Sequence, residues 1–257
     1  MRRTARIAVG VLLAAAGCRS LPLGELAPLA PDDARPGILL ASLDERAAAR
    51  QALRGRAHLA VDSDDGEVQL RGSQVLAVAR PDRLRVEVQG FLSQTQAVLV
   101  TDRGAFQFFV PAEGTFESGA VYRGLLWQVA RIDLEPTQVV DLVLGAPLPD
   151  RRLELRRALT TPEGGVRIEL ADAGGSRRDA LVFDAEARLR RFERHAGGER
   201  LWQVRFDDYA AVDGTPFAHR IQLDFDGSGT RVELSLRDVE LNPRLSDGLF
   251  RLESPRA

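Results

Sequence analysis

The residue types that most often catalyse reactions or bind metal ions are sparse and scattered in this sequence. His58, His195 and His219 are the only histidines, and no two are four residues apart or paired with a cysteine. Histidine-based metal sites usually need such spacing, so we expect no metal site. The sequence contains no G-x-S-x-G motif, no G-x-G-x-x-G motif and no P-loop. We therefore expect no enzymatic activity and no cofactor, although a Ser-His-Asp triad assembled in space stays open.

One acidic segment, residues 224–229 with the sequence Asp-Phe-Asp-Gly-Ser-Gly, begins like a calcium-binding loop. The twelfth position of such a loop is normally a glutamate that binds the ion through both oxygens, and here it is Ser235. Strand-like sequence flanks the segment, whereas helices flank the loop of an EF-hand. We therefore interpret this segment as the turn of a β-hairpin.

The only cysteine, Cys18, follows a segment that predicts a covalent modification. Three arginines among the first six residues precede a short apolar run, residues 7–16. That run is too short to span a membrane as a helix of about 20 residues, and it ends in small residues like a secretory signal. Residues 15–18, Ala-Ala-Gly-Cys, resemble a bacterial lipobox with alanine in place of the more common leucine. The pattern predicts a signal peptide over residues 1–17 and a lipid-modified Cys18, against the alternative of a free thiol.

The residue after the cysteine predicts the membrane in which the anchor would lie. Aspartate at that position is the familiar signal for retention in the inner membrane, and this chain has Arg19 instead. We therefore expect a lipid anchor in the outer membrane, facing the periplasm. Two or three acyl chains would hold firmly, because each buried CH₂ contributes about 0.8 kcal/mol.

Length and composition limit the remaining function classes. The chain has 257 residues and a formal net charge of −2, which excludes a strongly basic nucleic-acid-binding protein. Its hydrophobic content of 44% is sufficient for a substantial core. All cationic side chains are arginine, and the acidic residues alternate with them along predicted strands. That alternation predicts a solvated sheet face carrying cross-strand charge pairs.

The folded region is predicted to begin after a proline-rich tether. Residues 20–35 contain three prolines without a helical or strand pattern, so we assign residues 18–41 to the tether and residues 42–257 to one domain. Ser42 and Glu45 have the spacing of a capping box. This predicts a helix from about Leu43 to Leu53, ended by Gly55.

The segment 80–101 is the most informative part of the predicted domain. Its apolar residues alternate with charged ones, which predicts a strand, and a second apolar run follows after residue 96. A hairpin tip is normally polar, but Phe91 and Leu92 lie at this one. These two side chains either fold back into a core or contact something apolar outside the protein.

The rest of the chain predicts an antiparallel sheet interrupted by helices. Apolar residues at helical spacing predict one helix near residues 121–129, and a proline at a first helical position predicts a second, from Pro136 to about residue 144. Strands separated by turn residues continue to Phe250. The fold class is therefore mainly β with α+β character. The helices either fill the core, which composition alone favours, or cover a curved sheet and leave an apolar cavity.

Several of these segments, in this order, resemble the LolA/LolB lipoprotein-localisation family. The resemblance extends from about Leu43 to Phe250. It rests on Gly55-Arg56, Arg-Pro-Asp-Arg-Leu-Arg at 80–85, Gly-Phe-Leu-Ser at 90–93, the helix pair with Leu-Val-Leu-Gly-Ala-Pro-Leu-Pro at 142–149, and the ending at 241–250. The chain departs in having Phe-Leu-Ser where Pro-Leu-Gly is familiar, and in a longer stretch after the second helix.

The resemblance implies a strongly curved antiparallel sheet that forms an incomplete barrel, with a helical lid around an apolar cavity. It also implies that Phe91 and Leu92 form a membrane-insertion loop. The residues implied to line the lipid-binding cavity are Leu84, Val86, Val88, Val98, Val100, Phe106, Phe108, Leu125, Leu126 and Val129.

The function implied by the resemblance is that of a LolB-like outer-membrane lipoprotein. Such a protein accepts acylated lipoproteins from a LolA-like periplasmic carrier and inserts them into the membrane, and we expect it to act as a monomer. One alternative is a relative that binds another lipid or serves as an accessory subunit in an envelope pathway. An envelope hydrolase and a structural lipoprotein with a filled core are the remaining alternatives.

Overall fold

The computed structural model describes residues 26–64 and 69–253. The predicted signal peptide, Cys18 and the first part of the predicted tether lie outside these residues. In the described part of the chain, no helix is long and apolar enough to cross a membrane.

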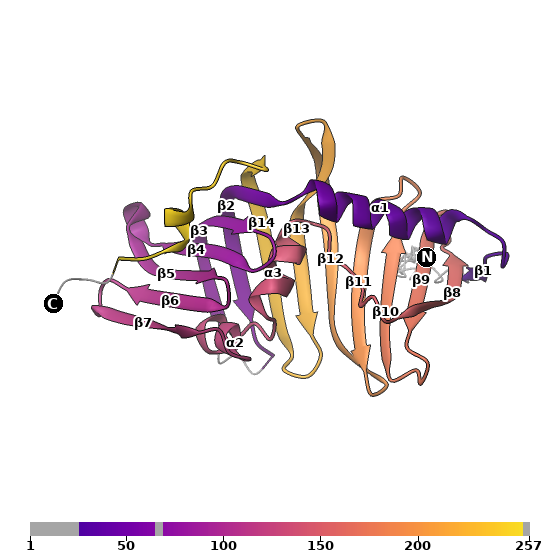
Figure 1. Ribbon diagram of the computed structural model, residues 1–257, viewed down its shortest axis with the longest axis horizontal. Helices are drawn as coiled ribbons and strands as arrows, with labels where there is room; N and C mark the ends of the chain where they lie inside the picture. Colours follow the sequence, from indigo (N-terminus) through magenta and orange to yellow (C-terminus); the bar gives the residue numbers. More distant parts are fainter. Residues whose placement is uncertain (1–25, 65–68, 254–257) are drawn as a thin grey trace, which may run out of the picture.

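A single antiparallel sheet of fourteen strands dominates the described residues (Figure 1). Its spatial order is β1-β8-β9-β10-β11-β12-β13-β14-β2-β3-β4-β5-β6-β7, so β1 and β7 are the two edges and the sheet does not close. The prediction of a large antiparallel sheet in an incomplete barrel is confirmed. The strands are β1 (Ala27–Pro28), β2 (Ala52–Asp62), β3 (Gln69–Ala79), β4 (Arg83–Gln89), β5 (Thr95–Asp102), β6 (Ala105–Val110), β7 (Thr115–Ala120), β8 (Glu154–Thr160), β9 (Val166–Ala171), β10 (Arg177–Phe183), β11 (Leu189–Ala196), β12 (Glu199–Val212), β13 (Thr215–Phe225) and β14 (Thr230–Leu241).

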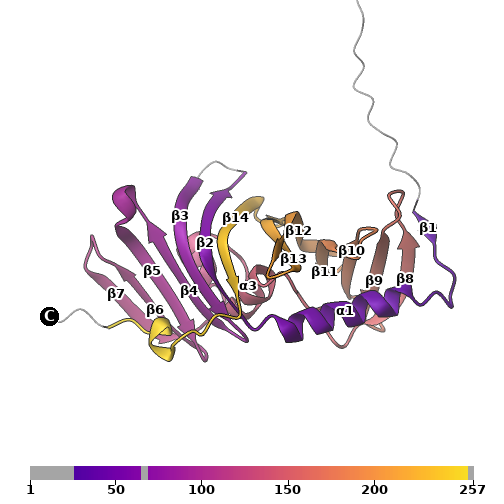
Figure 2. The same cartoon turned by 90° about the horizontal axis from the view of Figure 1, so that it is seen from above.

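The sheet bends strongly along its length. Viewed from above, β2 to β7 are turned away from β8 to β12, and they form a curved wall on one side of the molecule (Figure 2). Right-handed strand twist accumulates over many strands, and a sheet this wide bends as a result. The bend produces the concave face that the helices cover.

The polar face of β9 to β13 carries cross-strand ion pairs, as the alternation of arginine and acidic residues predicts. Arg167 bonds Glu193 at 3.1 Å, and Arg205 bonds Asp224 at 3.3 Å. The acidic segment 224–229 lies at the end of β13 and in the turn to β14, so its interpretation as a hairpin is confirmed.

The first helix begins earlier than predicted. Helix α1 spans Arg35–Ala49, so ordered structure begins inside the predicted tether, and Ser42 lies in the middle of the helix. The Ser42 hydroxyl donates to the carbonyl of Leu39 at 2.8 Å instead of capping a helix start. A buried stripe formed by Leu39, Leu43 and Ala47 packs α1 on the sheet, and this stripe extends the helix past the capping signal.

Two short helices connect opposite ends of the sheet and cover its concave face (Figure 1). Helix α2 spans Leu125–Ala130, and α3 spans Pro136–Val143; together we call them the lid helices. The predicted start at Pro136 is confirmed, and Glu135 and Gln138 form a capping box there. Both helices follow β7 and precede β8, so they cross from one side of the sheet to the other.

Candidate functional site

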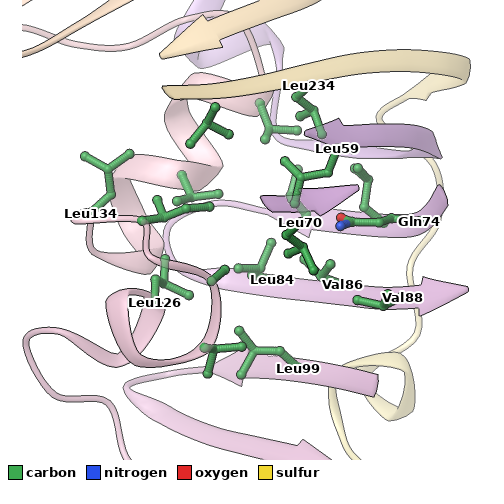
Figure 3. A pocket seen from close by; sticks show the side chains of 18 of the residues that line it. Leu59, Leu70, Gln74, Leu84, Val86, Val88, Leu99, Leu126, Leu134 and Leu234 are labelled. Carbon is green, nitrogen blue, oxygen red and sulfur yellow. The ribbon is translucent and has the colours of Figure 1, made fainter. Parts of the chain in front are cut away.

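An apolar pocket of about 340 Å³ lies between the lid helices and the concave face of the sheet (Figure 3). A volume of this size is within the range of small-molecule sites, roughly 300–1,000 Å³. Gln74 and Gln96 are its only polar lining residues among those the structure describes. The other lining residues are Leu59, Leu70, Leu76, Val78, Leu84, Val86, Val88, Ala97, Leu99, Phe108, Leu126, Val129, Ala130, Ile132, Leu134, Val139, Leu142, Val143, Ile221, Leu223, Val232 and Leu234.

Strand register explains why the pocket wall is continuous. Leu76 pairs with Val86, Val86 with Leu99, and Leu99 with Phe108 across four neighbouring strands. Directly opposed residues in antiparallel strands point to the same face, so these four side chains form one apolar row. The lid helices close the space in front of this row, with Leu126 from α2 and Leu142 and Val143 from α3.

Part of the predicted lining set meets at this pocket. Its members come from β4, β6 and α2, and the structure places them together although α2 is distant from β4 in sequence. These residues are Leu84, Val86, Val88, Phe108, Leu126 and Val129. Their binding of lipid stays a prediction.

The prediction that Val98 and Val100 line the pocket is wrong. Leu99 and Ala97 face the pocket, so their strand neighbours point to the opposite face. There Val98 and Val100 form a second buried cluster with Phe250 from the C-terminal segment. Residues 97–100 are apolar at every position, so alternation could not decide which face points inward.

Two other predicted residues are buried nearby without lining the pocket. The Phe106 ring packs edge-on against Tyr122, with ring centroids 5.9 Å apart. Leu125 is buried in the same apolar core. Both residues lie at the start of α2 or pack next to it, and neither lines the pocket.

Sequence reasoning missed the pocket residues of β2, β3, β13, β14 and α3. The local sequence pattern predicts strands in these segments, and Ile221, Leu223, Val232 and Leu234 of β13 and β14 line the pocket. It could not reveal that β14 lies beside β2, because this pairing joins segments about 170 residues apart. Long-range strand pairing is therefore what brings these side chains to the pocket.

The predicted hairpin tip forms a short 3₁₀ turn, η1 (Phe91–Ser93), which with Gly90 we call the tip loop. Leu92 is 84% exposed and has a left-handed backbone with φ 61°. A bulky residue in that region is strained by about 1–2 kcal/mol, and an exposed leucine gains nothing by burial to offset it. Strain and exposure together are typical of a functional position.

The tip loop adjoins the pocket through its two flanking strands. Val88 precedes the loop and Gln96 follows it, and both line the pocket. A Cβ atom at Gly90 would overlap the side-chain amide of Gln96, so only glycine lets this amide pack on the loop backbone. The loop and the pocket wall are therefore directly connected.

Two arginines attach the C-terminal end of α3 to the rest of the fold. The buried Arg50 guanidinium donates to the carbonyls of Leu144 at 3.2 Å and Pro216 at 2.7 Å. Arg80 donates to the carbonyl of Ala146 at 3.1 Å and forms an ion pair with Asp141. Cations are favourable at a helix C-terminus, where the carbonyls carry partial negative charge.

Burial perturbs the ionisation of these groups. It is the largest cause that lowers the pKa of Arg50 below its usual value. Burial also raises the pKa of the Asp141 carboxyl, and the neighbouring Arg80 charge opposes that rise. Both shifts have the direction expected for charged groups that are partly removed from water.

The pocket lining supplies apolar side chains and two glutamine amides. Within residues 26–64 and 69–253, no three His, Cys, Asp or Glu side chains meet in a geometry that could hold a metal ion. His195 lies on the polar sheet face beside Glu193, and its ring also contacts Arg178. The site is suited to enclosing an apolar group.

We predict that Arg80→Ala lowers the free energy of unfolding by about 2–3 kcal/mol. The variant loses the charged hydrogen bond to the carbonyl of Ala146 and the ion pair with Asp141. Arg54→Ala is the matched control, since its ion pair with Glu240 is half exposed and should contribute at most about 1 kcal/mol. Urea unfolding followed by tryptophan fluorescence measures both changes. Equal effects of the two variants would contradict the anchoring role of Arg80.

Comparison with known proteins identifies the fold. No protein-family model matches the sequence, and no curated protein matches it. A DUF1329 family protein from Desulfovibrio piger is 12% identical, with a TM-score of 0.61 over 83% of this chain and 95% of that chain. A LolA superfamily protein from Nitrosomonas europaea is 14% identical, with a TM-score of 0.57 over 83% of this chain and 97% of that chain.

A third structure, a domain from Vibrio parahaemolyticus named for outer membrane lipoprotein sorting, is 13% identical. Its TM-score is 0.53, and the match covers 85% of this chain and 97% of the domain. At these identities the similarity establishes the fold and not the activity. The chain shares its fold with these three solved structures.

Proposed function

We propose that this protein binds an acyl chain of a lipid-modified ligand in the pocket and delivers that ligand to a membrane through the tip loop. One observation carries the proposal: the two strands that flank the tip loop, with its strained and exposed Leu92, also line an almost wholly apolar pocket under the lid helices. The names of the LolA superfamily protein and the lipoprotein-sorting domain support it.

The energetics of acyl chains favour an enclosed pocket over a surface patch. Each CH₂ group removed from water contributes about 0.8 kcal/mol, so a chain of about 16 carbons gains on the order of 10 kcal/mol. Only a site that surrounds the chain can provide this burial. The described lining supplies apolar side chains from the sheet and from both lid helices.

The finer form of the proposal is a LolB-like role. In this account a lipid on Cys18 anchors the protein to the outer membrane, a LolA-like carrier supplies acylated lipoproteins, and Leu92 contacts the acyl region of the membrane. The sequence has no P-loop, so in this role no nucleotide bound at such a motif drives the transfer of the ligand. The ligand instead moves to the site that binds it more tightly. A different lipid cargo is the alternative that binding experiments distinguish.

Filling the pocket should abolish acyl binding. We predict that Ala97→Trp, in a chain that also carries Cys18→Ala to prevent acylation, lowers affinity for palmitic acid at least tenfold. Ala97 lines the pocket, and an indole there would occupy the space of the chain. Displacement of a fluorescent fatty acid measures the affinity.

The matched control for this experiment is Ala120→Trp, which adds the same side chain at an exposed position of edge strand β7. It should leave the affinity for palmitic acid within twofold. Undiminished binding by the Ala97→Trp variant would show that the acyl chain binds elsewhere.

Delivery to the membrane should depend on Leu92. We predict that Leu92→Glu retains the fold and palmitic acid binding but lowers transfer of an acylated protein to liposomes at least tenfold, because a carboxylate at the tip resists entering lipid. The assay counts acylated protein that floats with the liposomes. Leu155→Glu is the control, since Leu155 is 50% exposed on β8, far from the tip loop in the sheet order. Similar transfer by both variants would show that the tip loop does not deliver the ligand to the membrane.

A further inference from the structure

A second cleft, of about 1,400 Å³, opens beside the pocket. It lies between the segment around the lid helices and the adjoining hairpin ends of β11–β12 and β13–β14. Leu134 lines both the cleft and the pocket, so at this point a single buried side chain separates the two spaces. The residues of the cleft are Arg123, Gly124, Trp127, Asp133, Leu134, Glu135, Gln138, Arg152, Arg177, Arg194, Glu199, Arg200, Leu201, Trp202, Phe225, Asp226, Gly227 and Ser228.

Helix α2 forms the partition between the two spaces. Leu126 and Val129 line the pocket, whereas Trp127 lines the cleft. The labelled Leu126 and Leu134 side chains lie at the lid-helix side of the pocket (Figure 3). A ligand whose acyl chain occupies the pocket near Leu134 would therefore place its attached group one side chain away from the cleft.

Stacked aromatic rings and a hydrogen-bonded arginine form the floor of the cleft. Trp202 stacks on Phe192, with ring centroids 5.5 Å apart and planes inclined by 21°. The Arg194 guanidinium lies 5.3 Å from the Trp202 ring centroid. Two hydrogen bonds, of 3.0 and 2.9 Å, fix that guanidinium to the buried Asp179 carboxylate. Both tryptophans of the chain line this cleft.

Charges of both signs surround this floor. Five arginines and four acidic residues line the cleft. Among the described residues, the side chains of Arg123, Asp133 and Glu199 have no hydrogen-bond or ion-pair partner. The cleft therefore offers hydrogen-bond donors and acceptors to a ligand, next to indole surfaces. A single anionic head group would use only the cations.

We propose that the cleft binds the polypeptide that follows the acylated residue of a lipid-modified protein, while the acyl chain occupies the pocket. This rests on the proposed acyl-binding function. Tryptophan and arginine are the residues that dominate binding energies in protein interfaces, and backbone amides satisfy donors and acceptors together. The proposed ligand is thus an acylated polypeptide. The pocket binds its acyl chain, and the cleft binds its peptide.

The test compares three probes on the full chain carrying Cys18→Ala. The probes are palmitic acid, an N-terminally palmitoylated octapeptide with charges of both signs, and palmitoyl lysophosphatidylglycerol, each measured by displacement of a fluorescent fatty acid. We expect the lipopeptide to bind at least tenfold more tightly than palmitic acid. Trp127→Ala and Arg123→Ala should each lower lipopeptide affinity about tenfold and leave palmitic acid within twofold.

The control variant is Arg237→Ala, an exposed arginine on β14 outside both linings, which should change neither affinity. Equal affinities for lipopeptide and palmitic acid would overturn this inference alone. So would a lysophospholipid that binds more tightly than the lipopeptide and loses affinity in the Arg123→Ala variant, since the cleft would then bind a lipid head group. Failure of all three probes to bind would overturn the proposed function as well.

Discussion

The attachment of α3 to the sheet is the interaction on which the rest of this structure depends. Helix α3 buries Val140, Leu142 and Val143 in the core on the concave side of the sheet, and hydrogen bonds and an ion pair fix its C-terminal end. Arg50 and Arg80 provide that attachment through carbonyls at the end of the helix and through Asp141. The apolar side of α3 faces the sheet. Side chains do not fill all of the space between them, and this space is the pocket.

Much of the fold could be predicted from local pattern. Alternating residues marked the strands, and Pro136 at a first helical position marked the start of α3. The start of α1 was missed because the Ser42 and Glu45 spacing imitates a cap, while burial of Leu39 and Leu43 extends the helix. Packing on the sheet outweighs a local capping signal, which contributes only about 1 kcal/mol.

The candidate site was predictable only in part. Alternation in β4 correctly grouped Leu84, Val86 and Val88, since charged residues separate them. In β5 every residue from 97 to 100 is apolar, because the C-terminal segment with Phe250 buries the second face of the sheet. A strand that is buried on both faces is apolar at every position, so its sequence does not show which side chains face the pocket. The exposed Leu92, by contrast, was visible in the sequence as an apolar residue at a hairpin tip.

Photo-crosslinking would test the central claim, that the pocket holds an acyl chain, most directly. A palmitic acid analogue with a diazirine at the end of its chain would be bound to the full chain carrying Cys18→Ala, irradiated, and its adducts located by peptide mass spectrometry. We predict adducts on pocket residues such as Val86, Leu99 and Val143, and excess palmitic acid should suppress them. Adducts confined to exposed leucines such as Leu155, with pocket peptides unmodified, would contradict it.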